Sequence, residues 1–122
     1  MGKILIVEDD ESLRHVQTQL IERMGLEVVA VADPLTALDQ FTADPDSIDL
    51  VLSDMTMPKM TGREMGEKMI DLKPGLPFIL CSGYSDVISR ADIESSGFFA
   101  FLQKPISIKV LRENIRQALE KA

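Results

Sequence analysis

The chain has 122 residues, 45% of them apolar, and a formal net charge of −7 at pH 7. This length suits a single domain over residues 1–122, and the apolar content is well above that of disordered chains. The acidic balance argues against direct nucleic-acid binding and fits cations and protein partners better. No apolar run approaches the roughly 20 residues that span a membrane and no signal-peptide pattern is present, so a cytoplasmic protein is expected.

The first half of the chain alternates short apolar runs with longer amphipathic stretches. Residues 3–7 are a β-branched run, which predicts a strand, and residues 12–24 carry apolar side chains at helical spacing. Residues 27–31 predict a second strand. Asp33 and Pro34 then supply a helix N-cap followed by proline at the first helical position. The apolar residues expected on the inner face of this second helix are Leu35, Leu38 and Phe41.

The second half of the chain continues the same alternation. Its predicted strands are residues 49–53, 77–81 and 98–102. Its helical segments are predicted around residues 65–72, within residues 86–95 and over residues 108–119. Because the strands are apolar along their length, as expected when helices cover both faces, the sequence predicts an α/β fold. The expected architecture is a doubly wound parallel sheet of the (βα)5 type with right-handed crossovers.

Polar residues stand at the end of several predicted strands. They are Glu8, Asp9, Asp54, Ser82 and Lys104. Ligands of doubly wound sheets bind beyond the carboxyl ends of the strands, so these residues are expected to meet in one crevice. Carboxylates gathered there repel each other, and Lys104 together with a hard divalent cation such as Mg²⁺ would offset their charge. The cluster indicates a metal site beside a phosphoryl site, in which a carboxylate is the nucleophile.

Residues that often carry chemistry receive plainer interpretations elsewhere. Cys81 lies in an apolar run and has no disulfide partner, so a buried core position is expected. His15 has no second His or Cys nearby, which favours an ordinary helix position over a metal or phosphotransfer role. The seven methionines are interpreted mainly as core and loop packing.

The sequence resembles the response-regulator receiver family of two-component signalling, from about Lys3 to the end of the chain. The resemblance rests on ILIVEDDESLR at residues 4–14, LVLSDMTMPKMTG at 50–62, FILCSGYSD at 78–86 and AFLQKP at 100–105. It implies a flavodoxin-like receiver fold whose five strands lie in the order 2-1-3-4-5.

Matched position by position, the resemblance implies a metal site around the phosphoacceptor. Asp54 matches the phosphoacceptor, which also contacts the metal, and Glu8 and Asp9 match the acidic pair that binds Mg²⁺. The backbone carbonyl of Thr56, two residues beyond the aspartate, matches a further ligand. The acidic pair is Glu-Asp where the family usually has Asp-Asp, which keeps the charge and lengthens one arm.

The resemblance also implies a switch. Ser82 matches the family's Ser/Thr, and Lys104 matches the lysine that pairs with the phosphoacceptor. Phe101 stands at the aromatic switch position, where the family commonly has Tyr, although an ordinary strand residue is nearly as good an interpretation. Phosphorylation would then alter the surface formed by the fourth helix, the fifth strand and the fifth helix.

The function implied is that of a phosphorelay receiver that takes a phosphoryl group from phosphohistidine onto Asp54. The expected partners are a histidine kinase or a histidine phosphotransfer domain and a downstream protein target, and a weak homodimer is compatible with the family. The chain would be a signalling domain that catalyses its own phosphorylation and dephosphorylation, not an enzyme with a separate substrate.

Other classes of function fit the residues less well. A receiver fold that only binds proteins would need none of the acids, Ser82 or Lys104. An aspartate-nucleophile phosphatase commonly needs a second acid two residues on, where this chain has Thr56. A flavin or dinucleotide carrier needs a glycine- or hydroxyl-rich first loop, whereas residues 8–11 are all acidic.

The biological context stays open in the sequence. No output domain follows the last predicted helix, so the chain is either a free-standing regulator or the receiver segment of a larger protein. The SGYSD stretch and the methionine-rich loop favour the receiver of a hybrid sensor kinase. The cognate kinase, the signal and the phosphoryl lifetime are not encoded in recognisable form.

Overall fold

The computed structural model describes residues 2–83 and 97–121. The strands are β1 (Lys3–Val7), β2 (Glu27–Val31), β3 (Leu50–Asp54), β4 (Phe78–Ser82) and β5 (Ala100–Gln103). The helices are α1 (Glu11–Arg23), α2 (Pro34–Ala43), α3 (Gly62–Leu72) and α5 (Ile108–Lys121), with a short 3-10 turn, η1, at Pro45–Ser47. The helix predicted within residues 86–95 lies outside the described residues.

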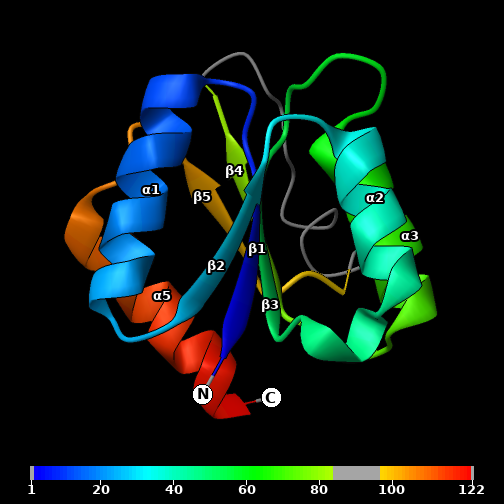
Figure 1. Cartoon of the computed structure of the whole chain (residues 1–122). Coiled ribbons are helices and arrows are strands. Elements are labelled where there is room, and N and C mark those ends of the chain that lie inside the picture. Colours follow the sequence, from blue (N-terminus) through cyan, green and yellow to red (C-terminus); the bar gives the residue numbers. More distant parts are fainter. Residues whose placement is uncertain (1, 84–96, 122) are drawn as a thin grey trace.

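The strands form one parallel sheet in the order β2-β1-β3-β4-β5. This confirms the predicted fold class and strand order. Helices α1 and α5 lie on one face of the sheet, and α2 and α3 lie on the other (Figure 1). The carboxyl ends of the strands all point to the upper edge in that view, so the residues that follow them are brought to one side of the molecule.

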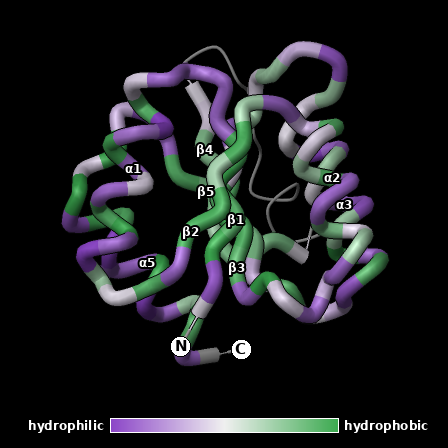
Figure 2. Tube along the Cα trace, in the orientation of Figure 1, coloured by the Kyte–Doolittle hydropathy of each residue, from purple (hydrophilic) through white to green (hydrophobic). Residues whose placement is uncertain are grey.

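Two apolar layers, one on each face of the sheet, form the core. On β1, Leu5 and Val7 belong to the layer beneath α2 and α3, whereas Ile4 and Ile6 belong to the layer beneath α1 and α5. This alternation is the period of two that a strand imposes on its side chains. Because both layers are apolar, the strands are hydrophobic throughout while polar residues lie on the outer surfaces of the helices (Figure 2).

Side-chain caps fix where the helices begin. As predicted, Asp33 caps α2, its carboxylate accepting a 2.9 Å hydrogen bond from the backbone N–H of Thr36. Helix α3 begins with a capping box in which Thr61 and Glu64 each accept a hydrogen bond from the other's backbone N–H. Such caps typically contribute about 1 kcal/mol each to stability.

One predicted core position is wrong. Leu35 was expected on the inner face of α2, yet 42% of it is exposed. The buried residues of α2 are Pro34, Ala37 and Phe41, which are spaced by three and four residues and therefore share one face. Leu35 lies about 100° around the helix from Pro34 and consequently points to solvent.

The amino-terminal end of β3 is held by polar contacts from two directions. The backbone N–H of Lys3 donates to the Asp49 carboxylate at 2.8 Å, and the N–H of Asp49 donates to the carbonyl of Lys3 at 2.9 Å. From the end of α3, the Lys73 ammonium donates to the carbonyls of Ile48 at 2.6 Å and Pro45 at 3.3 Å. These contacts fix the start of the strand that ends in Asp54.

Among the described helices, none combines the length and apolar character needed to cross a membrane.

Candidate functional site

The polar residues singled out in the sequence meet at the carboxyl edge of the sheet. Glu8 follows β1, Asp54 ends β3, Ser82 ends β4 and Lys104 follows β5. Asp54 and Ser82 are the last residues of their strands, whereas the sequence predicted that each would directly follow its strand. Glu8, Asp54 and Ser82 are only 2%, 8% and 6% exposed, so this edge forms a crevice of buried polar groups.

The Lys104 ammonium is the cation at the centre of this crevice. Its Nζ lies 2.7 Å from Asp54 Oδ1 and 3.5 Å from Glu8 Oε1. Burial opposes its positive charge, but the hydrogen bond to Asp54 and the two carboxylate charges outweigh that effect, so its pKa lies above the usual value. The backbone N–H of Lys104 also donates to the carbonyl of Ser82 at 2.7 Å, which fixes the lysine to the end of β4.

The Glu8 carboxyl sits in an unfavourable position for a negative charge. Burial, followed by the charge of Asp54, raises its pKa to about 7, although the backbone N–H of Asp10 donates to Oε2 at 3.2 Å and opposes the shift. Its Oε1 is buried and has no hydrogen-bond partner in the described part of the chain. This shift favours the protonated form of Glu8, and a cation that binds there must compete with that proton.

Carboxylate oxygens of Glu8, Asp9 and Asp54 all lie within 4.8 Å of one another. Two oxygens that bind one Mg²⁺ at about 2.1 Å can be at most about 4.2 Å apart, so small side-chain movements would close the cluster around an ion. The unsatisfied Glu8 Oε1 and the exposed Asp9 carboxylate supply free lone pairs for that purpose. This donor set fits a hard divalent cation.

The loop between β3 and α3 leaves the sheet beside this cluster and contains Thr56, the residue predicted to offer its carbonyl. Lys59 has a φ of 74°, and the N–H of Met60 donates to the carbonyl of Pro58 at 2.9 Å, so these residues form a γ-turn. Met57 is buried, and its packing ties the loop to the core. The γ-turn and the buried Met57 therefore give this loop a defined conformation against the core.

Phe101, at the predicted switch position, is half-buried and packs against the layer beneath α2 and α3. Its ring centroid lies 5.5 Å from that of Phe98, which stacks on Phe78 at 4.8 Å. Phe101 therefore points inward in this structure. Its role as a switch stays a prediction.

The predicted positions of Cys81 in the core and of His15 on a helix are confirmed. Cys81 is buried, and burial raises the pKa of its thiol to about 12, so the reactive thiolate does not form at neutral pH. His15 is exposed on α1.

Sequence reasoning missed Arg14 on α1. Its Nη1 donates a 2.9 Å hydrogen bond to the backbone carbonyl of Glu8, which holds the loop that carries the acidic pair. The signal was available, because a basic residue one turn after Asp10 lies on the helix face nearest that loop.

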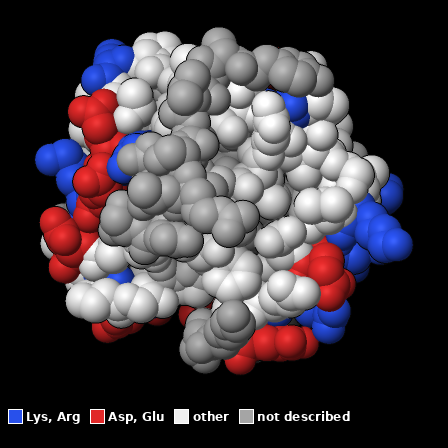
Figure 3. Space-filling view, turned by 180° about the vertical axis from the view of Figure 1, so that it is seen from behind, with Lys and Arg blue, Asp and Glu red and all other residues white. Residues whose placement is uncertain are grey.

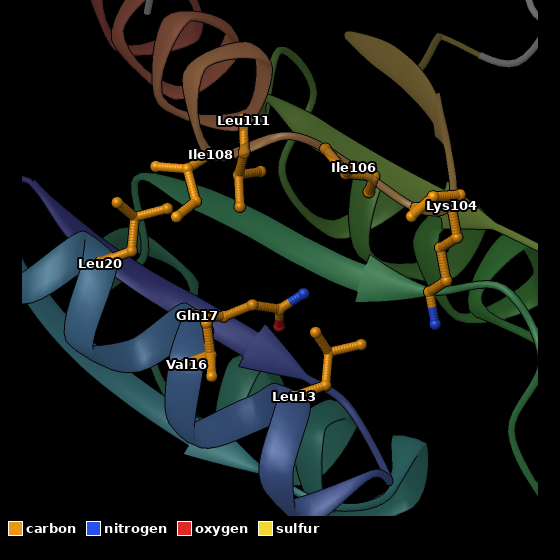
Figure 4. A pocket seen from close by; sticks show the side chains of 9 residues that line it. Leu13, Val16, Gln17, Leu20, Lys104, Ile106, Ile108 and Leu111 are labelled. Carbon is orange, nitrogen blue, oxygen red and sulfur yellow. The ribbon is translucent and has the colours of Figure 1, made fainter.

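An apolar groove adjoins the crevice between α1 and α5 (Figure 4). It has a volume of about 450 Å³, and Lys104 is one of the residues that line it. Its other lining side chains include Leu13, Val16, Leu20, Ile106 and Ile108. Val16 and Ile108 are 51% and 55% exposed, so apolar side chains are accessible at this groove. On the face seen from behind, acidic and basic side chains both lie along the rim of the described surface (Figure 3).

Comparisons with known proteins agree with this geometry. The sensor kinase CckA of Brucella abortus (strain 2308) is 30% identical over 118 residues, which are 97% of this chain and 12% of CckA. The response regulator receiver protein CpdR of the same organism is 27% identical over 119 residues, 98% of each chain. A crystal structure of a response regulator receiver domain protein from Clostridium thermocellum superposes with a TM-score of 0.92 at 28% identity, covering 98% of this chain and 95% of that one.

A sequence model of the response regulator receiver domain matches residues 4–116. That match covers nearly the whole chain and every residue of the crevice. Together with the strand order and the acidic cluster beside Lys104, it shows that the chain belongs to the response regulator receiver family, whose members accept signals in two-component systems.

Proposed function

We propose that this domain accepts a phosphoryl group from phosphohistidine onto Asp54, in a reaction that requires Mg²⁺. The observation that carries the proposal is the 2.7 Å contact between Lys104 Nζ and Asp54 Oδ1, within a cluster of carboxylates that fits a divalent cation. A carboxylate oxygen of Asp54 attacks phosphorus, the P–N bond to the donor imidazole breaks, and an acyl phosphate forms. Bound Mg²⁺ would neutralise charge on the phosphoryl oxygens.

The other residues of the crevice would act on the same phosphoryl group. The Lys104 ammonium stands where it can pair with a phosphoryl oxygen once one Asp54 oxygen is esterified. The Ser82 hydroxyl ends the neighbouring strand and would donate to another oxygen. Glu8 and Asp9, with Asp54 and the carbonyl of Thr56, would hold the metal. The added group carries a charge of about −1.5 to −2, which draws Lys104 and Ser82 toward it.

Movement of Lys104 and Ser82 toward the phosphoryl group would connect the crevice to the protein surface near β5 and α5. Ser82 ends β4, and Lys104 follows β5 and leads into α5, so both are attached to the elements at that side of the sheet. We therefore propose that phosphorylation alters the β5–α5 surface that a downstream protein binds. Water later hydrolyses the acyl phosphate, so the domain would catalyse only its own modification and reset.

The experiment uses acetyl phosphate and Mg²⁺ with the purified domain. Wild-type protein is expected to gain one phosphoryl group that hydroxylamine removes, as it does from an acyl phosphate. Asp54→Asn should not form this hydroxylamine-labile adduct, whereas Asp46→Asn, an exposed acid in η1 far from the crevice, should form it normally. Equal labile phosphorylation of wild type and Asp54→Asn would refute the assignment. A wild-type domain that never forms the adduct would favour the alternative, a receiver fold that only binds proteins.

We further propose that the phosphodonor protein, a histidine kinase or phosphotransfer domain, seats an apolar helix in the groove between α1 and α5. The groove begins at Lys104, whose ammonium touches Asp54, so a protein that presents phosphohistidine to Asp54 must cover this region (Figure 4). Exposed Val16 and Ile108 would then be buried by the donor.

Val16→Ser and Ile108→Ser should therefore slow phosphorylation by a histidine kinase that phosphorylates the wild type, by about 10-fold each, as expected for truncating a buried contact. Their phosphorylation by acetyl phosphate should not change, because the small donor does not use the groove. Leu72→Ser is the matched control, since Leu72 is also 49% exposed but lies at the end of α3. Unchanged kinase rates for both groove variants would place the donor elsewhere.

Two contexts fit the comparisons. The chain corresponds to a small part of CckA but to nearly all of CpdR, so both a segment of a hybrid kinase and a free-standing regulator have relatives. A weak homodimer stays a prediction.

A further inference from the structure

Strand β3 contains one hydroxyl in an otherwise apolar run that leads to the phosphoacceptor. Ser53 is 1% exposed, and its Oγ donates a 2.9 Å hydrogen bond to the backbone carbonyl of Asp54. Burying a hydroxyl costs free energy unless it is hydrogen-bonded, so this bond is what makes the residue tolerable at that position. This hydrogen bond connects Ser53 to the backbone of Asp54, the proposed phosphoacceptor.

The same carbonyl oxygen is enclosed from the other side by the start of α3. A Cβ atom built on Gly62 would lie 2.1 Å from the carbonyl oxygen of Asp54 and 2.9 Å from Ser53 Oγ. The glycine therefore lies directly against this oxygen. The loop closes on itself at the same place, because the N–H of Gly62 donates to the carbonyl of Met55 at 2.8 Å.

The nitrogen of the same peptide group, which belongs to Met55, is also held in place. The backbone N–H of Met55 donates to the carbonyl of Cys81 at 2.8 Å, which ties it to β4. The peptide group that joins Asp54 to Met55 is thus held at its oxygen by Ser53 and Gly62 and at its nitrogen by Cys81. This arrangement is called the Asp54 peptide clamp below.

We infer that Ser53 is a positioning residue for the phosphoryl-transfer reaction: through the Asp54 peptide clamp, its hydroxyl sets the orientation of the Asp54 carboxylate and of the Thr56 carbonyl that follows it. The inference rests on the proposed function of Asp54. Rotation of the clamped peptide would move the Asp54 carboxylate, whose residue supplies its carbonyl, and, through Met55, would also move the Thr56 carbonyl two peptide groups further on. A displacement of about 1 Å in a reacting group can slow a reaction by about 100-fold.

A pair of variants with matched shape isolates the hydroxyl. Ser53→Thr and Ser53→Val add the same volume to a buried position, and only Thr keeps the donor. Both should be less stable to urea because both overpack the contact with Gly62, and Ser53→Val should lose somewhat more because the carbonyl of Asp54 also loses its hydroxyl donor. At saturating acetyl phosphate and Mg²⁺, Ser53→Thr should be phosphorylated about 10-fold faster than Ser53→Val, and it should bind Mg²⁺ more tightly in calorimetry.

Ser53→Ala provides a second comparison, which does not depend on overpacking. It should also be phosphorylated about 10-fold more slowly than wild type. Ser47→Ala, which removes a 2.8 Å hydroxyl-to-carbonyl hydrogen bond in the η1 turn before β3, should keep the wild-type rate.

The outcomes separate this inference from the proposed function. Equal rates for Ser53→Thr and Ser53→Val, or a wild-type rate for Ser53→Ala, would overturn the positioning role while leaving Asp54 as phosphoacceptor. Failure of the wild-type protein to form a labile phosphoryl adduct would instead remove the proposed function itself.

Discussion

Gly62→Ala is expected to destabilise the domain by about 3 kcal/mol, at the upper end of what an added methyl group costs in a packed interior. The new Cβ would meet the carbonyl oxygen of Asp54 at 2.1 Å, and this oxygen belongs to the backbone of a central strand. Neither partner can rotate away, so α3 or the end of β3 must shift. Urea unfolding measures the loss of stability, and the folded fraction should accept phosphoryl at least 10-fold more slowly because Asp54 is displaced.

Gly66→Ala is the matched control, since it makes the same substitution one turn later in α3. Its Cβ would approach ring atoms of Phe98 and Phe78 at 2.8 and 2.9 Å, so it also crowds the core. Those atoms are at the far ends of side chains, and the expected loss is smaller, about 1–2 kcal/mol. The folded fraction should be phosphorylated at the wild-type rate. If Gly62→Ala matched Gly66→Ala in both stability and rate, the close approach at Gly62 would have no functional consequence.

Lys104→Met is expected to produce two changes of opposite sign. Phosphorylation by acetyl phosphate should slow by about 100-fold, because the ammonium that meets charge on the phosphoryl group is gone. Affinity for Mg²⁺ should rise several-fold, since the carboxylates of Asp54 and Glu8 lose the cation now 2.7 and 3.5 Å away. Calorimetry with Mg²⁺ and a phosphorylation time course measure the two effects separately.

Lys109→Met tests whether the loss of any positive charge has these effects. Lys109 is exposed on α5, so its removal changes the net charge equally but leaves the crevice intact. Both the Mg²⁺ affinity and the phosphorylation rate should stay near wild type. Weaker Mg²⁺ binding by Lys104→Met would mean that the lysine organises the carboxylates rather than competing for them.

The sequence was sufficient to predict the architecture because each element carries its own local pattern. The apolar runs of β1 and β3 read as buried strands, and the rule that parallel strands end at one edge then brought Glu8, Asp54 and Lys104 together. The strand order came from the family resemblance. The sheet confirms both inferences.

What the sequence could not show depends on contacts between remote elements. Periodicity assigned Leu35 to the core, but the neighbours of α2 decide which of its faces is buried. The groove needs α1 and α5 side by side, and the enclosed carbonyl of Asp54 needs Gly62 to fold back onto it. The sequence shows Ser53 as a lone hydroxyl in an apolar strand. Only the structure shows that this hydroxyl donates a hydrogen bond to the carbonyl of Asp54.

The anchoring of β3 at both ends has a consequence for the direction in which a signal can travel. Lys73 and Asp49 fix its beginning, and the Asp54 peptide clamp fixes its finish. Because both ends of β3 are held by these contacts, phosphorylation of Asp54 should not shift the strand along its own axis. Motion started by the phosphoryl group should therefore spread sideways across the sheet toward Ser82 and Lys104, while the opposite pole of the molecule stays still.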